Sequence, residues 1–239
     1  NKCWTRNCTL QILFMKALID GRIREEEFKY LLEELKLDII LIEPSKSVYP
    51  EISGHSDIFY AKIDDKIYCS PNARYIQTNF IIGKEPVRYS YPDDVKYNVC
   101  QIGKYVIGSK YVDETLKDKV NVVVKQGYTK CNIAVTGDNS CITSDVGIYE
   151  KLKSLGMDVL LLQTDNIGLI NKDHLFSEMH GFIGGATALV NDTFILFGDV
   201  DYLSKENRKN LLEHIERHNL KFKDFKYLKI VDYGGIITI

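Results

Sequence analysis

A repeated pattern of two short apolar segments around a tight turn constrains the fold of this chain more than any other feature. Four copies occur, at residues 57–70, 98–109, 131–144 and 186–198. Each copy places Gly, Asp, Asn or Lys at the turn, and such residues tolerate the positive φ of hairpin turns. The pattern predicts four β-hairpins of one design, and therefore a protein built from repeated units.

After each hairpin the hydrophobic period changes from 2 to about 3.6, which predicts a helix followed by a third strand. In the clearest unit, Asp145 begins a short helix, Gly156 ends it, and a strand follows at 158–163. The other two well-marked units predict helices at 113–119 and 204–219, followed by strands at 120–126 and 220–225. The helix after residue 70 is poorly marked.

A fifth unit is split between the two ends of the chain. Residues 16–22 predict a strand, 24–36 an amphipathic helix and 37–43 a second strand, but this unit lacks its first strand. The C-terminal segment 233–239 (YGGIITI) can supply it, which would close the units into a ring and tie down both ends. The alternative is an open α/β sheet with hairpin insertions. We therefore expect an α/β ring with five-fold pseudosymmetry as a single domain at 15–239, preceded by an N-terminal extension at 1–14.

Composition excludes several classes of function. The 239 residues are 45% hydrophobic and 27% charged, and 31 basic and 33 acidic side chains are well mixed along the chain. No basic face indicates a nucleic-acid partner, and no apolar run reaches the roughly 18–20 residues of a membrane span. The six cysteines form no CxxC pair. We expect a cytoplasmic protein, a monomer or homodimer, with a small-molecule partner.

The segment GHSDIF places Gly54, His55 and Asp57 where a loop enters a predicted strand. Residues i and i+2 of a strand point to one face, so the histidine and the aspartate can share a pocket. A carboxylate beside an imidazole sets its proton affinity, as general acid–base catalysis requires. The alternative is a loop histidine capped by the aspartate.

Two further segments lie at equivalent strand entrances. In GYTKC, Cys131 can face solvent, and the adjoining Lys130 can favour its thiolate. The alternative is a half-buried structural cysteine. In DYGG, Asp232 precedes Gly234 and Gly235, which would let the backbone approach a ligand closely. Here the alternative is a solvated aspartate before a bulge.

The remaining histidines predict neither a metal site nor a cofactor site. His214 and His218 are four apart in HIERH, which lacks the glutamate placement of the zinc-protease motif, and a polar helix face explains them. His174 and His180 lie in a loop without metal-ligand spacing.

The units and motifs together resemble the pentein propeller of the guanidine-modifying enzymes, which include arginine and agmatine deiminases, dimethylarginine dimethylaminohydrolases and amidinotransferases. GHSDIFYAKIDD is similar to the His-x-Asp strand of the deiminases, GYTKC to the segment that presents the nucleophile, and DYGG to the carboxylate segment. The likeness covers most of residues 16–239 and is closest to uncharacterised bacterial members of the superfamily. The segments occur here in a different order, which a circular permutation of a closed ring would explain.

The resemblance implies a cysteine-dependent hydrolase or amidinotransferase acting on a guanidino or amidino compound. It implies Cys131 as nucleophile, His55 as general acid–base, and Asp57 with Asp232 as anchors for the planar cation, without a cofactor. One departure is that residues 184–189 contain no acid where the enzymes place a further carboxylate. The alternative function is a non-catalytic ring, either a binding module like a ribosome-binding initiation factor of this fold or a small-molecule sensor.

Overall fold

Five three-stranded sheets of one design account for most of the strands. The structure, a computed structural model, describes residues 15–163 and 166–239; the proposed extension at 1–14 lies outside these ranges. In each sheet the middle strand pairs antiparallel with one neighbour and parallel with the other. The sheets comprise β17 (Ile237–Thr238), β1 (Lys16–Asp20) and β2 (Asp38–Ile42); β3 (Tyr60–Ile63), β4 (Lys66–Cys69) and β5 (Ile81–Ile82); β6 (Cys100–Ile102), β7 (Tyr105–Ser109) and β8 (Val122–Val124); β9 (Ile133–Gly137), β10 (Ser140–Thr143) and β11 (Asp158–Leu161); and β14 (Thr187–Val190), β15 (Thr193–Leu196) and β16 (Lys221–Lys223).

The four predicted hairpins are confirmed, and their turns show why those residues stand there. Asp64, Gly103 and Asn191 adopt positive φ of 52°, 52° and 54° at the turns of three of them. Residues of these types tolerate the left-handed region, so the sequence at the turn fixes the register of both strands.

The helices connect the hairpins to the third strands. They are α1 (Glu25–Lys29), which continues as a π-helical turn at Tyr30–Glu34, α3 (Glu114–Lys117), α4 (Val146–Ser154) and α5 (Lys205–Arg217). Asp145 caps α4 by accepting a hydrogen bond from the Ile148 N–H, and Gly156 follows its end with a φ of 81°. The predicted start and end of this helix are therefore confirmed. After β4 the chain forms turns and β5 instead of a helix.

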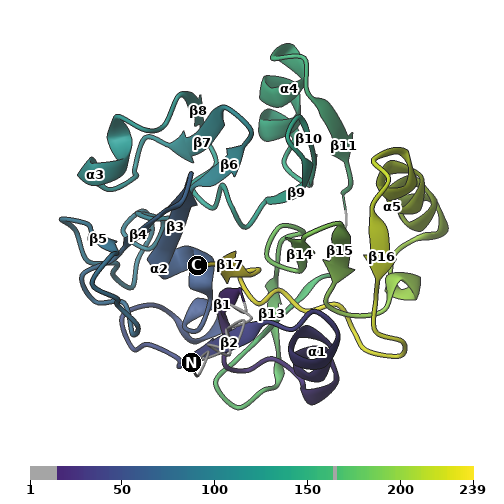
Figure 1. The fold of residues 1–239 in the computed structure, drawn as a ribbon, viewed down its shortest axis with the longest axis horizontal. Coiled ribbons are helices and arrows are strands. Elements are labelled where there is room, and N and C mark those ends of the chain that lie inside the picture. Colours follow the sequence, from purple (N-terminus) through teal and green to yellow (C-terminus); the bar gives the residue numbers. More distant parts are fainter. Residues whose placement is uncertain (1–14, 164–165) are drawn as a thin grey trace, which may run out of the picture.

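The first strands of the five units lie toward the centre of the molecule, and the connecting helices α1, α3, α4 and α5 lie toward its outside (Figure 1). Contacts join β14 to β9, β9 to β6, β6 to β3, and β3 to β17. The C-terminal strand β17 pairs antiparallel with β1, joining Ala17 to Thr238 and Leu18 to Ile237. The predicted union of the two ends of the chain in one sheet is confirmed.

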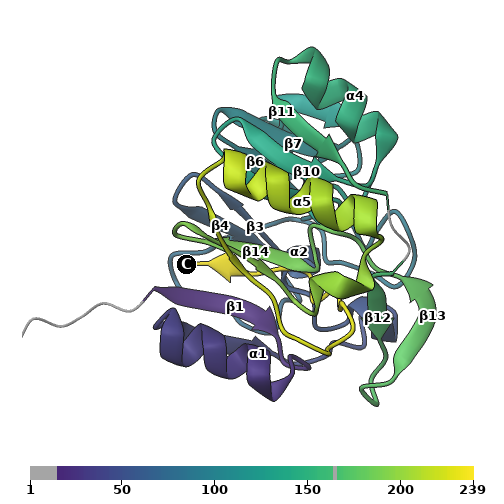
Figure 2. The ribbon, with the colours of Figure 1, turned by 90° about the vertical axis from the view of Figure 1, so that its right-hand side faces the viewer.

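A further hairpin, β12 (Gly168–Ile170) with β13 (Phe176–His180), was not predicted. It projects from the lower edge of the molecule in Figure 2. Gly168 binds it to the segment before β17 through a bridge to Val231. Its strands carry few alternating apolar residues, so periodicity did not reveal them.

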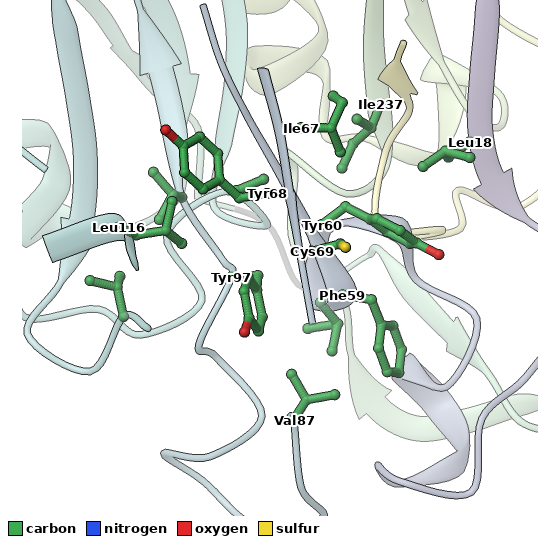
Figure 3. Packing of buried hydrophobic residues seen from close by; sticks show 14 of the residues in the cluster. Leu18, Phe59, Tyr60, Ile67, Tyr68, Cys69, Val87, Tyr97, Leu116 and Ile237 are labelled. Atoms are coloured by element: carbon green, nitrogen blue, oxygen red, sulfur yellow. The ribbon is translucent and has the colours of Figure 1, made fainter. Parts of the chain in front are cut away.

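The largest cluster of buried apolar side chains joins the sheet formed by the two ends of the chain to the neighbouring units. Leu18, Ile67 and Ile237 lie close together in it, from β1, β4 and β17 respectively (Figure 3). Among the helices of residues 15–163 and 166–239, none has both the length and the hydropathy needed to cross a bilayer.

The packing of Ile237 predicts that the short strand β17 contributes strongly to stability. Ile237→Ala removes a side chain that is 5% exposed and leaves a cavity, which costs about 2–5 kcal/mol in the free energy of unfolding. Urea unfolding measures the change, and Ile236→Ala, a half-buried neighbour, is the matched control. Equal losses in the two variants would contradict the role given to β17.

Candidate active site

Four polar side chains from three sequence segments are buried together at the beginnings of the central strands. His55 and Asp57 precede β3, Cys131 precedes β9 and Asp232 precedes β17, and all are at most 2% exposed. Gly234, in the segment of Asp232, packs against the segment of His55 and Asp57, because a Cβ built there would be 2.5 Å from the His55 Cβ and 2.8 Å from the Asp57 Oδ1. Its φ of 70° also favours glycine. The predicted residues are therefore brought together.

The local structure around His55 differs from the prediction. His55 precedes a single helical turn, α2 (Ser56–Phe59), and β3 begins only at Tyr60. The strand alternation that we expected for His55 and Asp57 is therefore wrong. The turn forms because the Ile58 N–H bonds to the His55 carbonyl and the Ser56 hydroxyl bonds to the Gly234 carbonyl.

Cys131 is buried, at 2% exposed, and so is less accessible than either the solvent-facing or the half-buried cysteine that the sequence left open. The chain folds into a tight turn here, with the Asn132 N–H bonded to the Tyr128 carbonyl and the Ile133 N–H to the Lys130 carbonyl. This turn places the thiol beneath the loop that carries it. Lys130 remains half-buried and near the site, since its Nζ lies 3.4 Å from a Cβ built at Gly235.

Asn98 is a site residue that the sequence analysis missed. Its Nδ2 donates to the Cys131 Sγ at 3.1 Å and to the Asp57 carbonyl at 3.0 Å, and its Oδ1 accepts from the Lys130 N–H at 2.6 Å. One buried carboxamide thus orients the thiol relative to the Asp57 segment. The repeat contained a signal for this residue: Asn98 stands two residues before β6, just as Cys131 stands two residues before β9.

His55 lies between two carboxylates. Its Nδ1 is 3.6 Å from the Asp232 Oδ1, and its Nε2 is 3.9 Å from the Asp20 Oδ2. Asp20 is itself held by the Arg22 guanidinium, whose Nε bonds to its Oδ1 at 2.9 Å and whose Nη2 bonds to its Oδ2 at 2.5 Å. Gly54 is needed here, because a Cβ at that position would be 2.5 Å from the Asp20 Oδ1. This buried ion pair was not predicted from the sequence.

Asp232 is fixed by the backbone. Its Oδ2 accepts from the Phe182 N–H and its Oδ1 from the Gly234 N–H, each at 2.8 Å. Gly185 packs directly against the same carboxylate, where a Cβ would collide with it. The segment that lacks an acid therefore contributes backbone and close packing to the site instead.

Unpartnered polar atoms concentrate in this site. Among the described residues, five buried side-chain nitrogen or oxygen atoms have no hydrogen-bond partner, and four of them are both ring nitrogens of His55 and both carboxylate oxygens of Asp57. Such atoms are costly to bury, and nearly all buried polar groups in proteins are paired. A concentration of them at one place marks a site built to bind a polar group.

Comparison with known proteins gives a family and a fold. Residues 18–237 match a family of unknown function, DUF6873. The chain belongs to the DUF6873 family. No curated protein matches it.

Solved structures similar to this DUF6873 protein include two of dimethylarginine dimethylaminohydrolase. A histidine-to-glycine variant in adduct with S-methyl-L-thiocitrulline has a TM-score of 0.54 and 10% identity, covering 89% of this chain and 92% of that one. A cysteine-to-serine variant from Pseudomonas aeruginosa, complexed with citrulline, has a TM-score of 0.54 and 10% identity, covering 95% and 99%. The DUF6873 chain therefore shares the mixed α/β fold of these proteins.

Burial controls the charge of the two carboxyl groups in the DUF6873 site. It raises the pKa of Asp57 to about 6, against the attraction of the Lys130 ammonium. Burial, followed by repulsion from Asp57, raises the pKa of Asp232 to about 7. Both carboxyl groups therefore titrate close to neutral pH.

Burial also keeps the histidine and the thiol neutral. It lowers the pKa of His55 to about 3, with the Asp20 carboxylate acting in the opposite direction. Burial and the charges of Asp57 and Asp232 raise the pKa of the Cys131 thiol well above its ordinary value. In the unliganded protein at neutral pH, Cys131 is therefore a thiol and His55 an unprotonated base.

Aromatic side chains lie near the site, and a cavity adjoins Lys130. Tyr128 stacks near Phe182 with 6.0 Å between ring centroids, and its hydroxyl lies 3.2 Å from that of Tyr49. The cavity, of about 420 Å³, is lined by the central strands and by Lys130, but not by His55 or Cys131. A ligand held in this cavity would therefore not contact the thiol.

The unpaired carboxyl group of Asp57 should reduce stability at high pH. Because the folded state holds its proton more tightly than the unfolded state, stability falls as pH rises toward and through about 6. Asp57→Asn should therefore raise the free energy of unfolding by on the order of 2–3 kcal/mol at pH 8 and by about half as much at pH 5, because the loss of stability begins near the unfolded-state pKa of about 4. Urea unfolding at both pH values checks this.

The control is Asp65→Asn, which changes an exposed carboxyl group on the same hairpin. It should leave the free energy of unfolding unchanged at both pH values. An Asp57→Asn protein that is less stable than the wild type at pH 8 would contradict the account.

Proposed function

We propose that this protein is a cysteine-dependent enzyme, a hydrolase or an amidinotransferase, that acts on a small guanidino or amidino compound. The observation that carries the proposal is the concentration of unpartnered atoms of His55 and Asp57 beside the buried Cys131 and Asp232. Carboxylates with free lone pairs match the N–H groups of a planar cation, with paired, charge-assisted hydrogen bonds. The fold shared with dimethylarginine dimethylaminohydrolase supports the same kind of substrate.

The proposal includes the finer architecture. The five equivalent sheets and the contacts between their first strands support a closed, five-unit pentein propeller formed by a single domain at 15–239. In this interpretation β17 completes the ring, and Asp232 belongs to the wall of the active site.

The substrate itself supplies the charge that activates the thiol. Two carboxylates beside Cys131 oppose its ionisation, so the free site holds an unreactive thiol. A cation bound between Asp57 and Asp232 neutralises them and adds a positive charge next to the sulfur. Both effects lower the pKa of the thiol, so the nucleophile forms only when the substrate is in place.

The covalent step transfers one proton through His55 and exchanges a carbon–nitrogen bond for a carbon–sulfur bond. The Cys131 proton passes to His55, and the sulfur forms a bond to the amidine carbon. The protonated His55 returns this proton to the departing amine as the carbon–nitrogen bond breaks, leaving an amidino-thioether. Water or an acceptor amine, deprotonated by His55, attacks that carbon and releases the Cys131 thiolate.

The charges of the site restrict its substrate. The region equivalent to the missing acid holds Gly184 and Gly185, and the Lys130 ammonium opposes the charge of Asp57 and Asp232. A site with two carboxylates and one nearby ammonium suits a small or weakly basic amidine better than a strongly charged one.

A small-molecule sensor is the second candidate, favoured by one observation. The cavity of about 420 Å³ is large enough for a small ligand, yet Cys131 does not line it. A ligand held there alone would meet no nucleophile.

Labelling by 2-chloroacetamidine distinguishes the two functions. The amidinium group should bind the carboxylates and bring its carbon–chlorine bond to Cys131, giving a thioether adduct on that residue. Cys131→Ala should lose the label, and Cys141→Ala, which removes a buried cysteine of β10, should keep it. Peptide mass spectrometry maps the adduct. Labelling that persists in Cys131→Ala at the wild-type rate would contradict the proposed role of Cys131 as the nucleophile of an enzyme.

The raised carboxyl pKa values predict the pH dependence of cation binding. Asp57 and Asp232 are protonated at pH 5 and ionised at pH 8, whereas His55 stays neutral across this range. The affinity for acetamidine should therefore increase at least about tenfold from pH 5 to pH 8. Calorimetric titration measures it; an affinity that does not change with pH would contradict the assigned anchors, and Asp57→Asn should flatten the dependence.

A further inference from the structure

A cluster of two histidines and an aspartate lies on the outside of the molecule, away from the candidate active site. Asp158 begins β11, and His214 and His218 lie one turn apart at the end of α5. One ligand atom from each of the three lies within 4.8 Å of the others. His214 is only 1% exposed, so the expectation of a merely polar helix face is wrong for it.

Hydrogen bonds fix which nitrogen of His214 carries its lone pair. The Thr136 hydroxyl donates to the Ser140 hydroxyl, so its oxygen accepts from the His214 Nε2–H at 2.9 Å. The His214 Nδ1 accepts from the Arg217 Nη2 at 2.9 Å, and an arginine can only donate. A buried imidazole whose N–H is held by a protein oxygen, and whose other nitrogen directs its lone pair at a cation, is similar in arrangement to metal-bound histidines.

Arg217 lies where the three ligands converge. Its Nη2 contacts the Asp158 Oδ2 at 3.2 Å as well as the His214 Nδ1, and the same Oδ2 is 3.0 Å from the His218 Nε2. The arginine side chain is 59% exposed, so it can leave for solvent without a large loss of packing.

We propose that Asp158, His214 and His218 form a binding site for a divalent transition metal such as Zn²⁺, and that Arg217 occupies this site as a competing cation when no metal is bound. Imidazole nitrogen and carboxylate oxygen are ligands that Zn²⁺ accepts in tetrahedral sites. Ligand atoms around tetrahedral zinc are roughly 3.3 Å apart, given bonds of about 2.0–2.1 Å. The site therefore closes by a movement of the half-exposed Asp158 and His218 toward the fixed His214.

The position of the site gives the metal a structural effect. Asp158 belongs to the unit of β9–β11, whereas His214 and His218 belong to the helix of the next unit, and α5 contacts β11 directly. A bound metal would cross-link two neighbouring units. It would therefore raise the stability of the folded state, because the unfolded chain cannot present the three ligands together.

Calorimetric titration of tag-free, EDTA-treated full-length protein with ZnCl₂ tests the site, together with thermal unfolding. His218→Gln should weaken the zinc affinity by at least about tenfold and abolish the zinc-dependent rise in Tm. Arg217→Gln should act in the opposite direction and tighten binding, which a general loss of folding could not produce. His180→Gln, at an exposed histidine of β13, is the matched control and should bind as the wild type does.

Wild-type zinc affinity in His218→Gln, or an Arg217→Gln protein that binds zinc no more tightly than the wild type, would overturn the proposal. Neither result bears on cysteine chemistry at the central site.

Discussion

Burial of polar and ionisable groups, some of them without hydrogen-bond partners, is the constraint on which the rest of the structure depends. Asp57, Asp232 and His55 lie out of contact with water, and only the Asp232 carboxylate is satisfied by backbone N–H groups. Groups of this kind destabilise a fold unless the surrounding structure holds them in place. Five repeated sheets, four of them anchored by a hairpin and the fifth by the pairing of the two ends of the chain, provide that support by delivering several strand beginnings to one point.

Support comes from residues that have no chemical role of their own. Asn98 holds the Cys131 thiol against the Asp57 segment, and Gly234 and Gly185 let other segments approach the carboxylates closely. The Asp20–Arg22 pair adds a fixed, neutralised charge on the far side of His55. The site is therefore held before any ligand binds, which is what orientation of a poorly electrophilic carbon requires.

The sequence predicted the repeat well because hairpins are determined locally. Turn residues with positive φ, two-residue periodicity and a capped α4 are each contained within about ten residues, so the chain shows them directly. The pairing of β17 with β1 was also predictable, since one unit lacked a strand and one strand lacked a unit.

The details of the site depended on contacts between distant residues and could not be predicted in the same way. The α2 turn at His55 forms through the Ser56 bond to Gly234, 178 residues away, and so local alternation gave the wrong geometry. The burial of Cys131 results from a loop held by Asn98, which belongs to another unit. The β12–β13 hairpin has too weak a pattern to be recognised without its neighbours.

In the proposed mechanism, a bound cation converts the buried Cys131 thiol into a thiolate. The ultraviolet absorbance of thiolate, followed from pH 6 to pH 11 as the difference between the wild type and Cys131→Ser, measures the pKa of this thiol directly. Saturating acetamidine should lower that pKa by at least about one unit relative to the free protein. A thiol pKa that stays unchanged or rises when acetamidine binds would contradict the account.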